Sequence, residues 1–346
     1  MTGSEQPFVS VVLPVRNEAA FIESCLRSIL RNNYPKDRME VLVVDGMSDD
    51  GTRPIVERLA VEDSRIRLID NPNRTVPYAM NEGIRASSGA VLLRVDGHVV
   101  VAPDFVRQSV RALLDHPEAW VTGGVLETIG DTFVGRAISA VMSSPIGAGN
   151  ARFRLGAFKG FVEHVPFPCY WRWVFDKVGL FDEELVRNQD DELNQRIIRA
   201  GGKIYLDSDI RSQYYSRGSL RSLARQYYQY GFWRVRTIQK HGRPATLRQT
   251  IPLLFVLVWI VLIFGAVFWL PARYALAGFA ALYAAGLAIG TLQVGFRNGW
   301  RIALLVPIVA PLLHFTYGLG SLKGVWFWII LRGRWMPPDS VSRLSR

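Results

Sequence analysis

A chain of 346 residues is long enough for a soluble domain of ordinary size and a further region, and its hydrophobic fraction of 49% is concentrated towards the C-terminus. Two cysteines, Cys25 and Cys169, exclude a disulfide framework and suit a reducing compartment. Much of the net charge of +11 lies between Arg211 and Arg248, directly before an apolar region. A membrane explains this charge, and no recognition motif accompanies it, so we expect no nucleic acid partner.

Strand and helix patterns alternate in the first hundred residues. Valine-rich apolar runs predict strands at 8–14, 39–44, 65–70 and 90–95. The spacing of apolar residues predicts helices between them, near 21–30, 55–59 and 76–86. This alternation favours an α/β fold with a parallel sheet and right-handed crossovers.

The pattern changes in the next hundred residues. We expect a helix at 105–114 and a strand at 119–126. From Gly130 to Gly160 the chain is small, polar and rich in glycine, which suggests a mobile loop region. A further helix begins after Asn188, because acidic residues open it and glycines follow its end.

The strand at 91–95 ends abruptly in polar residues. Side chains alternate along a strand, so Asp96 and His98 point to the same side, and Gly97 permits a close approach to the backbone. Ligands of open α/β sheets bind at the carboxyl ends of the strands. We therefore expect two groups capable of binding a metal at this edge.

Three uncharged runs of about 20 residues follow, at 251–270, 274–295 and 302–322. We expect each to span a membrane, and the N-terminus has no signal peptide pattern. Before them, aromatic residues and arginines interleave over residues 220–235. This segment is either an interfacial amphipathic helix or a core helix with a solvated basic face.

The sequence leaves open on which side of the membrane the C-terminal tail lies. A cytosolic first domain and three spans leave the basic tail outside, against the positive-inside tendency. The arginines concerned are Arg332, Arg334, Arg343 and Arg346. Either residues 324–331 form a short re-entrant or interfacial helix, or the third run does not span.

Four ordered motifs carry a family resemblance: VSVVLPVRNE at 9–18, VVDGMSDDGT at 43–52, DGH at 96–98 and QDDELNQR at 189–196. With them, the chain resembles glycosyltransferase family 2, and in particular membrane-anchored exopolysaccharide glycosyltransferases of the succinoglycan-biosynthesis type. The resemblance covers about residues 8 to 235. It implies a cytosolic Rossmann-like GT-A domain for nucleotide sugars at 1–215, with a mostly parallel sheet. An interfacial helix or linker at 216–248, transmembrane helices at 249–332 and a basic tail at 333–346 would follow.

The resemblance also implies a donor site. Asp45 would accept a hydrogen bond from the uracil of a UDP-sugar. The other nucleotide-sugar residues would be Pro14, Arg16, Asn17, Glu18 and Asp96.

A divalent ion, Mn2+ or Mg2+, would bind Asp96 and His98 in place of the family's Asp-x-Asp motif. Imidazole suits manganese better than magnesium, so we expect a manganese preference. Alternatively, Asp96 contacts the ribose and His98 a phosphate, or His98 only lines the site.

Asp190 matches the family's general base, which removes the acceptor's hydroxyl proton in an inverting displacement. Gln189 departs from the usual glutamate, and Asp191 is the rival base. Alternatively, residues 190–192 only complement the helix dipole. The residues that would shape the acceptor site are Glu163, His164, Trp171, Asp191 and Trp233. Phe232 stands where processive synthases have arginine, which argues against processive synthesis.

We therefore expect a multi-pass protein of a bacterial-type inner membrane. It would transfer a sugar, glucose by family analogy, from a UDP-sugar to a polyprenyl-linked glycan in exopolysaccharide biosynthesis. Two alternatives are a polyprenyl-phosphate glycosyltransferase and a non-catalytic, membrane-anchored sugar-nucleotide scaffold.

Overall fold

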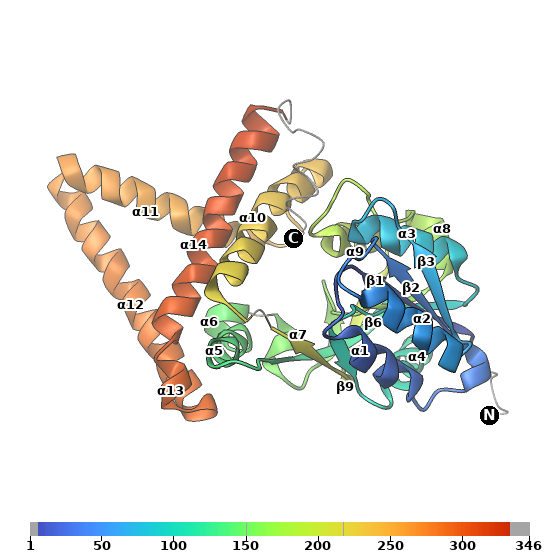
Figure 1. Cartoon of the computed structure of the whole chain (residues 1–346). Helices are drawn as coiled ribbons and strands as arrows, with labels where there is room; N and C mark the ends of the chain where they lie inside the picture. Colours follow the sequence, from blue (N-terminus) through green and yellow to red (C-terminus); the bar gives the residue numbers. More distant parts are fainter. Residues whose placement is uncertain (1–5, 150, 217, 333–346) are drawn as a thin grey trace. The chain divides into compact units, whose positions relative to one another are not determined.

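The computed structural model describes residues 6–149, 151–216 and 218–332, and it divides into two compact units. The first unit contains residues up to 127 and 156–214, and the second contains 128–155 and 215–332 (Figure 1). Segment 128–155, which the sequence placed within the first domain, thus groups with the C-terminal helices. The expected basic tail at 333–346 lies outside the described residues.

The first half of the sheet is parallel, as the alternating pattern predicted. Its strands lie in the order β3-β2-β1-β4, and helices connect them along the chain. The strands are β1 (Val9–Val15), β2 (Met39–Asp45), β3 (Ile66–Asp70) and β4 (Val91–Arg94). The connecting helices are α1 (Ile22–Leu30), α2 (Thr52–Glu62) and α3 (Val76–Ala86), with a 3-10 turn at Lys36–Arg38. Because these strands run in one direction, their carboxyl ends share one edge of the sheet.

The second half of the sheet is antiparallel. It continues from β4 in the order β8-β6-β9-β5, and β7 pairs with β9. Its strands are β5 (Val99–Val101), β6 (Ala119–Ile129), β7 (Lys159–Val162), β8 (Cys169–Trp171) and β9 (Lys203–Tyr215). The accompanying helices are α4 (Phe105–Asp115), α8 (Trp173–Val178) and α9 (Gln189–Arg199). The predicted α/β nucleotide-sugar fold is confirmed, but the sheet is mixed and its parallel part is limited to four strands.

A buried carboxylate stabilises the amino-terminal edge of the parallel strands. Glu40 Oε1 accepts hydrogen bonds from Ser10 Oγ at 2.6 Å and from Ser88 N at 2.7 Å, and Arg67 Nη1 donates to Oε2 at 3.1 Å. Burial raises the pKa of Glu40, but these hydrogen bonds outweigh it and hold the pKa below its ordinary value of 4.5. The folded state therefore favours the ionised form.

Replacing Glu40 with glutamine should destabilise the fold at neutral pH. A depressed pKa contributes stability above the unfolded value, and this contribution disappears as the pH falls through the folded value. We expect Glu40→Gln to lower the free energy of unfolding by about 1–3 kcal/mol at pH 7 and by less near pH 3. Denaturant unfolding at both pH values measures this, with the exposed Glu57→Gln as the control. An equal loss at both pH values would contradict the prediction.

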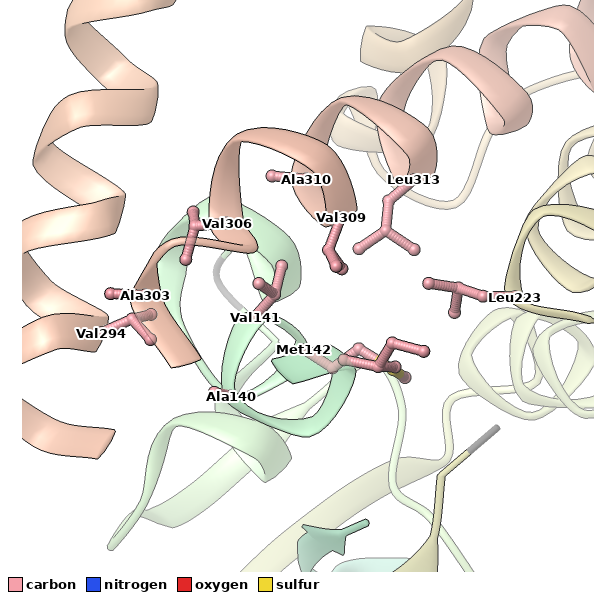
Figure 2. Packing of buried hydrophobic residues seen from close by; sticks show 11 residues of the cluster. Ala140, Val141, Met142, Leu223, Val294, Ala303, Val306, Val309, Ala310 and Leu313 are labelled. Atoms are coloured by element: carbon pink, nitrogen blue, oxygen red, sulfur yellow. The ribbon is translucent and has the colours of Figure 1, made fainter. Parts of the chain in front are cut away.

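The prediction of a mobile loop at 130–160 is wrong. This segment contains three helices, and β7 begins at its end. The helices are α5 (Phe133–Met142), α6 (Pro145–Ala148) and α7 (Arg152–Leu155). Thr132 caps α5 by accepting a hydrogen bond from the backbone of Gly135 at 2.9 Å. Figure 2 shows Val141 and Met142 of α5 in a hydrophobic cluster with side chains of the C-terminal helices. The small residues that suggested a loop instead allow this helix to pack closely.

Three helical stretches have the length and apolar composition needed to cross a membrane: 247–268, 270–298 and 300–330. Each of the three membrane spans predicted from the sequence therefore corresponds to a long apolar helix in the structure. They contain α11 (Ile251–Phe268), α12 (Leu270–Asn298), α13 (Trp300–Ala303) and α14 (Val306–Gly324), with a 3-10 turn at Leu247–Thr250 (Figure 1). Residues Val325–Ile330 continue α14 as a π-helix, rather than forming a separate short helix.

Helix α10 (Leu220–His241) packs along α14 in the second unit (Figure 1). A Cβ on Gly231 would lie 2.0 Å from the carbonyl oxygen of Tyr317, so the two backbones touch at this point. Trp233 on the same helix is only 1% exposed. Arg221 and Arg225 remain exposed. This arrangement favours the core helix with a solvated basic face, one of the two interpretations that the sequence left open.

Substituting the contact glycine should separate α10 from α14. We expect Gly231→Ala to lower the free energy of unfolding by about 1–3 kcal/mol, because the added methyl group collides with backbone. Gly278→Ala on α12 is the matched control, since a Cβ there meets no atom within 4 Å. Thermal unfolding of the detergent-purified protein compares them. Equal midpoints for the two variants would contradict the close packing.

Candidate functional site

Two loops at the carboxyl edge of the sheet are joined by hydrogen bonds. Asn17, whose φ is +56°, donates from its backbone N to Ser48 Oγ at 2.9 Å and from Nδ2 to Asp49 Oδ1 at 2.8 Å. The backbone N of Glu18 donates to Thr52 Oγ1 at 2.8 Å. The loops after β1 and β2, which carry two of the four sequence motifs, thus form one continuous structure.

Asp45 lies at the base of these loops and has no exposed side-chain surface. Both of its carboxylate oxygens accept hydrogen bonds: Oδ1 from Ser48 Oγ, and Oδ2 from Ser48 N and Arg53 Nη1, each at 3.0 Å. Arg53 Nη1 also binds Asp70 at 2.7 Å. Asp45 therefore shapes the loop, and because its side chain has no exposed surface, a neighbouring group must move before a nucleobase can reach the carboxylate.

The remaining residues of the first motif differ in accessibility. Pro14 is buried in β1 and is paired in register with Val44. The aliphatic part of Arg16 lies against Gly46, where a Cβ would be 3.2 Å from Arg16 Cδ. Of these residues, Asn17 is the most exposed to an incoming ligand.

The end of β4 lies directly against the first loop. A Cβ on Gly97 would lie 3.0 Å from Val15 and 3.1 Å from Glu18 Cγ, so the close approach expected at this glycine is present. His98 Nδ1 is 2.9 Å from Glu18 Oε1, and its ring contacts the Tyr214 ring edge-on at 5.0 Å. A carboxylate on Nδ1 fixes the imidazole and directs Nε2 to serve as a ligand or donor.

The buried side chain of Arg94 binds both Asp96 and Asp190, the carboxylates that the sequence motifs predicted as site residues. Arg94 Nε donates to Asp96 Oδ1 at 3.0 Å, and Arg94 Nη1 donates to Asp190 Oδ2 at 3.2 Å. The Arg94 side chain is 8% exposed, against 24% for Asp96 and 29% for Asp190. Burial lowers the pKa of Arg94, but the two aspartates more than offset this and the pKa is raised overall. The arginine stays charged.

Helix α9 presents Asp190 in its first turn. Asn188 precedes the helix with φ +61°, a conformation that asparagine tolerates better than most residues. Further along, Arg196 donates to the carbonyl oxygens of Val178 and Leu180, which anchors α9 to the preceding segment. Asp190 therefore extends from a fixed helix.

The proposed acceptor residues do not all gather at one place. His164 Nδ1 lies 3.3 Å from Asp191 Oδ1, and Glu163 is exposed beside it. Trp171 pairs with Val91 at the start of β4, roughly 16 Å from Asp96 at the usual rise per residue, at the opposite edge of the sheet. Trp233 is buried in the second unit, so its ring offers no open face to a sugar.

Strand β4 ends at Arg94, and Gly97 and His98 lie in a turn, so the strand alternation expected to place Asp96 and His98 on one side does not apply. Each residue nevertheless offers one donor atom of a kind that a metal shared with a ligand would use. Among the described residues, no group of three or more histidine, cysteine, aspartate or glutamate side chains could hold an ion. Arg94 occupies Asp96 Oδ1, which leaves Oδ2 and His98 Nε2 as donors. Magnesium and manganese sites often combine one or two protein ligands with substrate phosphates, and this donor set suits that arrangement.

Sequence reasoning missed Arg94 as a site residue, although a signal was present. An arginine inside the apolar strand at 91–95 must be paired, because an isolated buried charge is costly. It also missed Arg53 and Ser48, which bind Asp45.

Comparison with known proteins identifies the family of the chain. Residues 10–179 match the model of the family described as glycosyl transferase family 2. The succinoglycan biosynthesis protein ExoA of Rhizobium meliloti is 31% identical over 90% of this chain and 92% of its own. A Methanococcus voltae dolichyl N-acetyl-alpha-D-glucosaminyl phosphate 3-beta-D-2,3-diacetamido-2,3-dideoxy-beta-D-glucuronosyltransferase is 26% identical over 92% of this chain and 97% of its own.

A similar solved structure supports the fold. It is the mannosyltransferase PcManGT of Pyrobaculum calidifontis in complex with GDP-Man and Mn2+, with a TM-score of 0.58 and 22% identity. The match covers 93% of this chain and 88% of the other. At this identity the likeness establishes the GT-A fold and no further property.

Proposed function

The chain belongs to glycosyltransferase family 2, and from that premise we propose that it transfers a sugar from a UDP-sugar to a polyprenyl-linked oligosaccharide in exopolysaccharide assembly. In this proposal the reaction inverts the anomeric centre and Asp190 is the general base. The observation that carries it is the link from Asp96 through Arg94 to Asp190, which brings the donor edge and the base together.

The open oxygen of Asp190 suits the role of a base. Arg94 occupies Oδ2, and no donor among the described residues occupies Oδ1. A sugar hydroxyl is a poor nucleophile until its proton is removed, and a positioned carboxylate removes it as the new bond forms. The rival, Asp191, lies 3.3 Å from His164 Nδ1 and is not bound by Arg94, so it is not linked to Asp96 as Asp190 is. Asp190 is therefore the base in this proposal, and the pair of His164 and Asp191, with Glu163, contacts the acceptor.

The donor would lie across the joined loops. Asn17, Glu18 and Asp45 hold the nucleoside end, and Asp96 and His98 hold a divalent ion on the diphosphate. A bound cation supplies stabilisation of the negative charge on the departing nucleotide. The imidazole favours Mn2+ over Mg2+.

The proposal of a lipid-linked acceptor is based on the three apolar helices and on the names of two relatives. Three apolar helices are long enough to anchor the chain in a membrane. One relative is named for succinoglycan biosynthesis, and another for a dolichyl-linked sugar acceptor, which supports a lipid-linked acceptor in this proposal. We place the catalytic unit on the cytosolic side of a bacterial-type inner membrane, where sugar nucleotides and basic residues are found.

Asp190→Asn should abolish most transfer and spare donor binding. We expect acceptor-dependent UDP release to fall by about 10²–10⁴-fold, the usual contribution of a general base. The assay uses the detergent-purified chain, a panel of UDP-sugars with GDP-mannose for comparison, Mn2+ or Mg2+, and extracted polyprenyl-linked glycans.

Asp191→Asn is the matched control, and a larger loss there would move the base to Asp191. Activity on polyprenyl phosphate that survives Asp190→Asn would favour the polyprenyl-phosphate reaction, which needs a weaker base. UDP binding without transfer from any donor would favour the non-catalytic scaffold.

Glu18→Gln should weaken metal binding through His98. The carboxylate on Nδ1 raises the basicity of the imidazole, and losing such a partner typically costs 10–100-fold in metal affinity. We expect the Mn2+ concentration at half-saturation, measured by electron paramagnetic resonance with UDP present, to rise by roughly this factor. Asp49→Asn, which alters the neighbouring loop contact, serves as the control. An unchanged Mn2+ affinity in Glu18→Gln would remove His98 from the metal site.

A further inference from the structure

We infer that Arg94 is a positioning residue which couples the donor site to the base. One buried guanidinium binds Asp96, on the donor side, and Asp190, on the acceptor side. This inference rests on the proposed function and adds to it a residue that none of the four sequence motifs contains.

Arg53 also bridges two carboxylates, Asp45 and Asp70, but both lie at the ends of neighbouring strands on the donor side. Arg94 differs from it, and from three other arginines of the first unit, in its partners. Arg65, Arg172 and Arg196 each donate to at least one backbone carbonyl, and so anchor the main chain. Within the described residues, the side chain of Arg94 donates only to the two site carboxylates. Pairing alone would satisfy a structural arginine. The positioning role rests on which groups are paired, since they are the carboxylates assigned to the donor and to the base.

The planar guanidinium of Arg94 fixes the positions of the two carboxylates relative to each other. Nε and Nη1 belong to one rigid plane, so the oxygens that they bind are held in a fixed relation. Asp96 Oδ2 and Asp190 Oδ1 are then left for ligands, and their separation depends on one side chain. A lysine, with a single nitrogen on a flexible stem, cannot hold both oxygens in this way.

The charges around Arg94 also support its role as a positioning residue. Asp96 is followed by Gly97 and His98, and Asp190 is preceded by neutral Gln189. Arg94 supplies the buried positive charge that both carboxylates share, and it binds one oxygen of each without occupying the second. Removing it would leave two partly buried carboxylates without their cation.

The test compares Arg94→Lys and Arg94→Met with Arg65→Lys in the full-length, detergent-purified chain. Arg65 is a matched control because its side chain is 10% exposed and pairs with Asp63 at 2.6 Å. For each variant, kcat, the KM for the donor and the thermal midpoint are measured. Arg94→Lys keeps the charge, so it remains informative if Arg94→Met fails to fold.

We expect Arg94→Lys to lower kcat by about 10²-fold, the cost of a misplacement of about 1 Å, with little change in donor KM. Arg94→Met, which also removes the charge, should lower kcat at least as far. Arg65→Lys should leave kcat and the donor KM unchanged. A folded Arg94→Lys with wild-type kcat would overturn the inference.

Failure of the proposed function is distinguishable from failure of this inference. If the wild type transfers no sugar, the proposed function fails, and calorimetry of UDP binding with and without Mn2+ tests Arg94 alone. Arg94→Lys should then weaken the Mn2+-dependent part of UDP binding by about 10-fold, since Asp96 is no longer held. Unchanged binding would overturn the role of Arg94.

Discussion

The candidate site depends on one buried positive charge. Arg94 projects from β4 with almost no exposed surface, and a charge in that position is tolerated only if it is paired. Its partners are Asp96 and Asp190, which lie nearly a hundred residues apart in the sequence. Satisfying this charge therefore brings the end of a strand and the start of α9 together. The two carboxylates to which we assign donor and acceptor chemistry share one cation.

The rest of the first unit holds this constellation in place. Four parallel strands end at one edge, and the loops after β1 and β2 are joined there by Asn17, Ser48 and Asp49. Glu18 extends from that structure to His98, while Arg196 fixes α9 through backbone carbonyls. The loops determine the shape of the site, and the strands and α9 hold its residues in fixed positions. Sites built on such elements keep their geometry better than sites made of loops alone.

Sequence patterns predicted the parts of the fold that repeat a simple period. The first four strands, their helices and the three apolar spans follow from hydrophobic spacing, and the family motifs identified the GT-A domain. Of the antiparallel half only β6 was foreseen, as a strand at 119–126. Short strands such as β8 have no distinctive period, and the long β9 was also missed. Helix α5 was mistaken for a loop because its small residues resemble turn composition, and their packing partners are far away in the sequence. Trp171 was assigned to the acceptor site by the family resemblance, while strand register pairs it with Val91 at the start of β4.

The central claim is a single displacement in which Asp190 acts as a base and not as a nucleophile. The anomeric configuration of the product tests this most directly. Proton NMR of the glycan formed from an α-linked UDP-sugar would show the coupling constant of the new linkage. The account predicts a β-linkage, because one displacement inverts the centre. An α-linked product would contradict it, since retention requires a second displacement or a different mechanism.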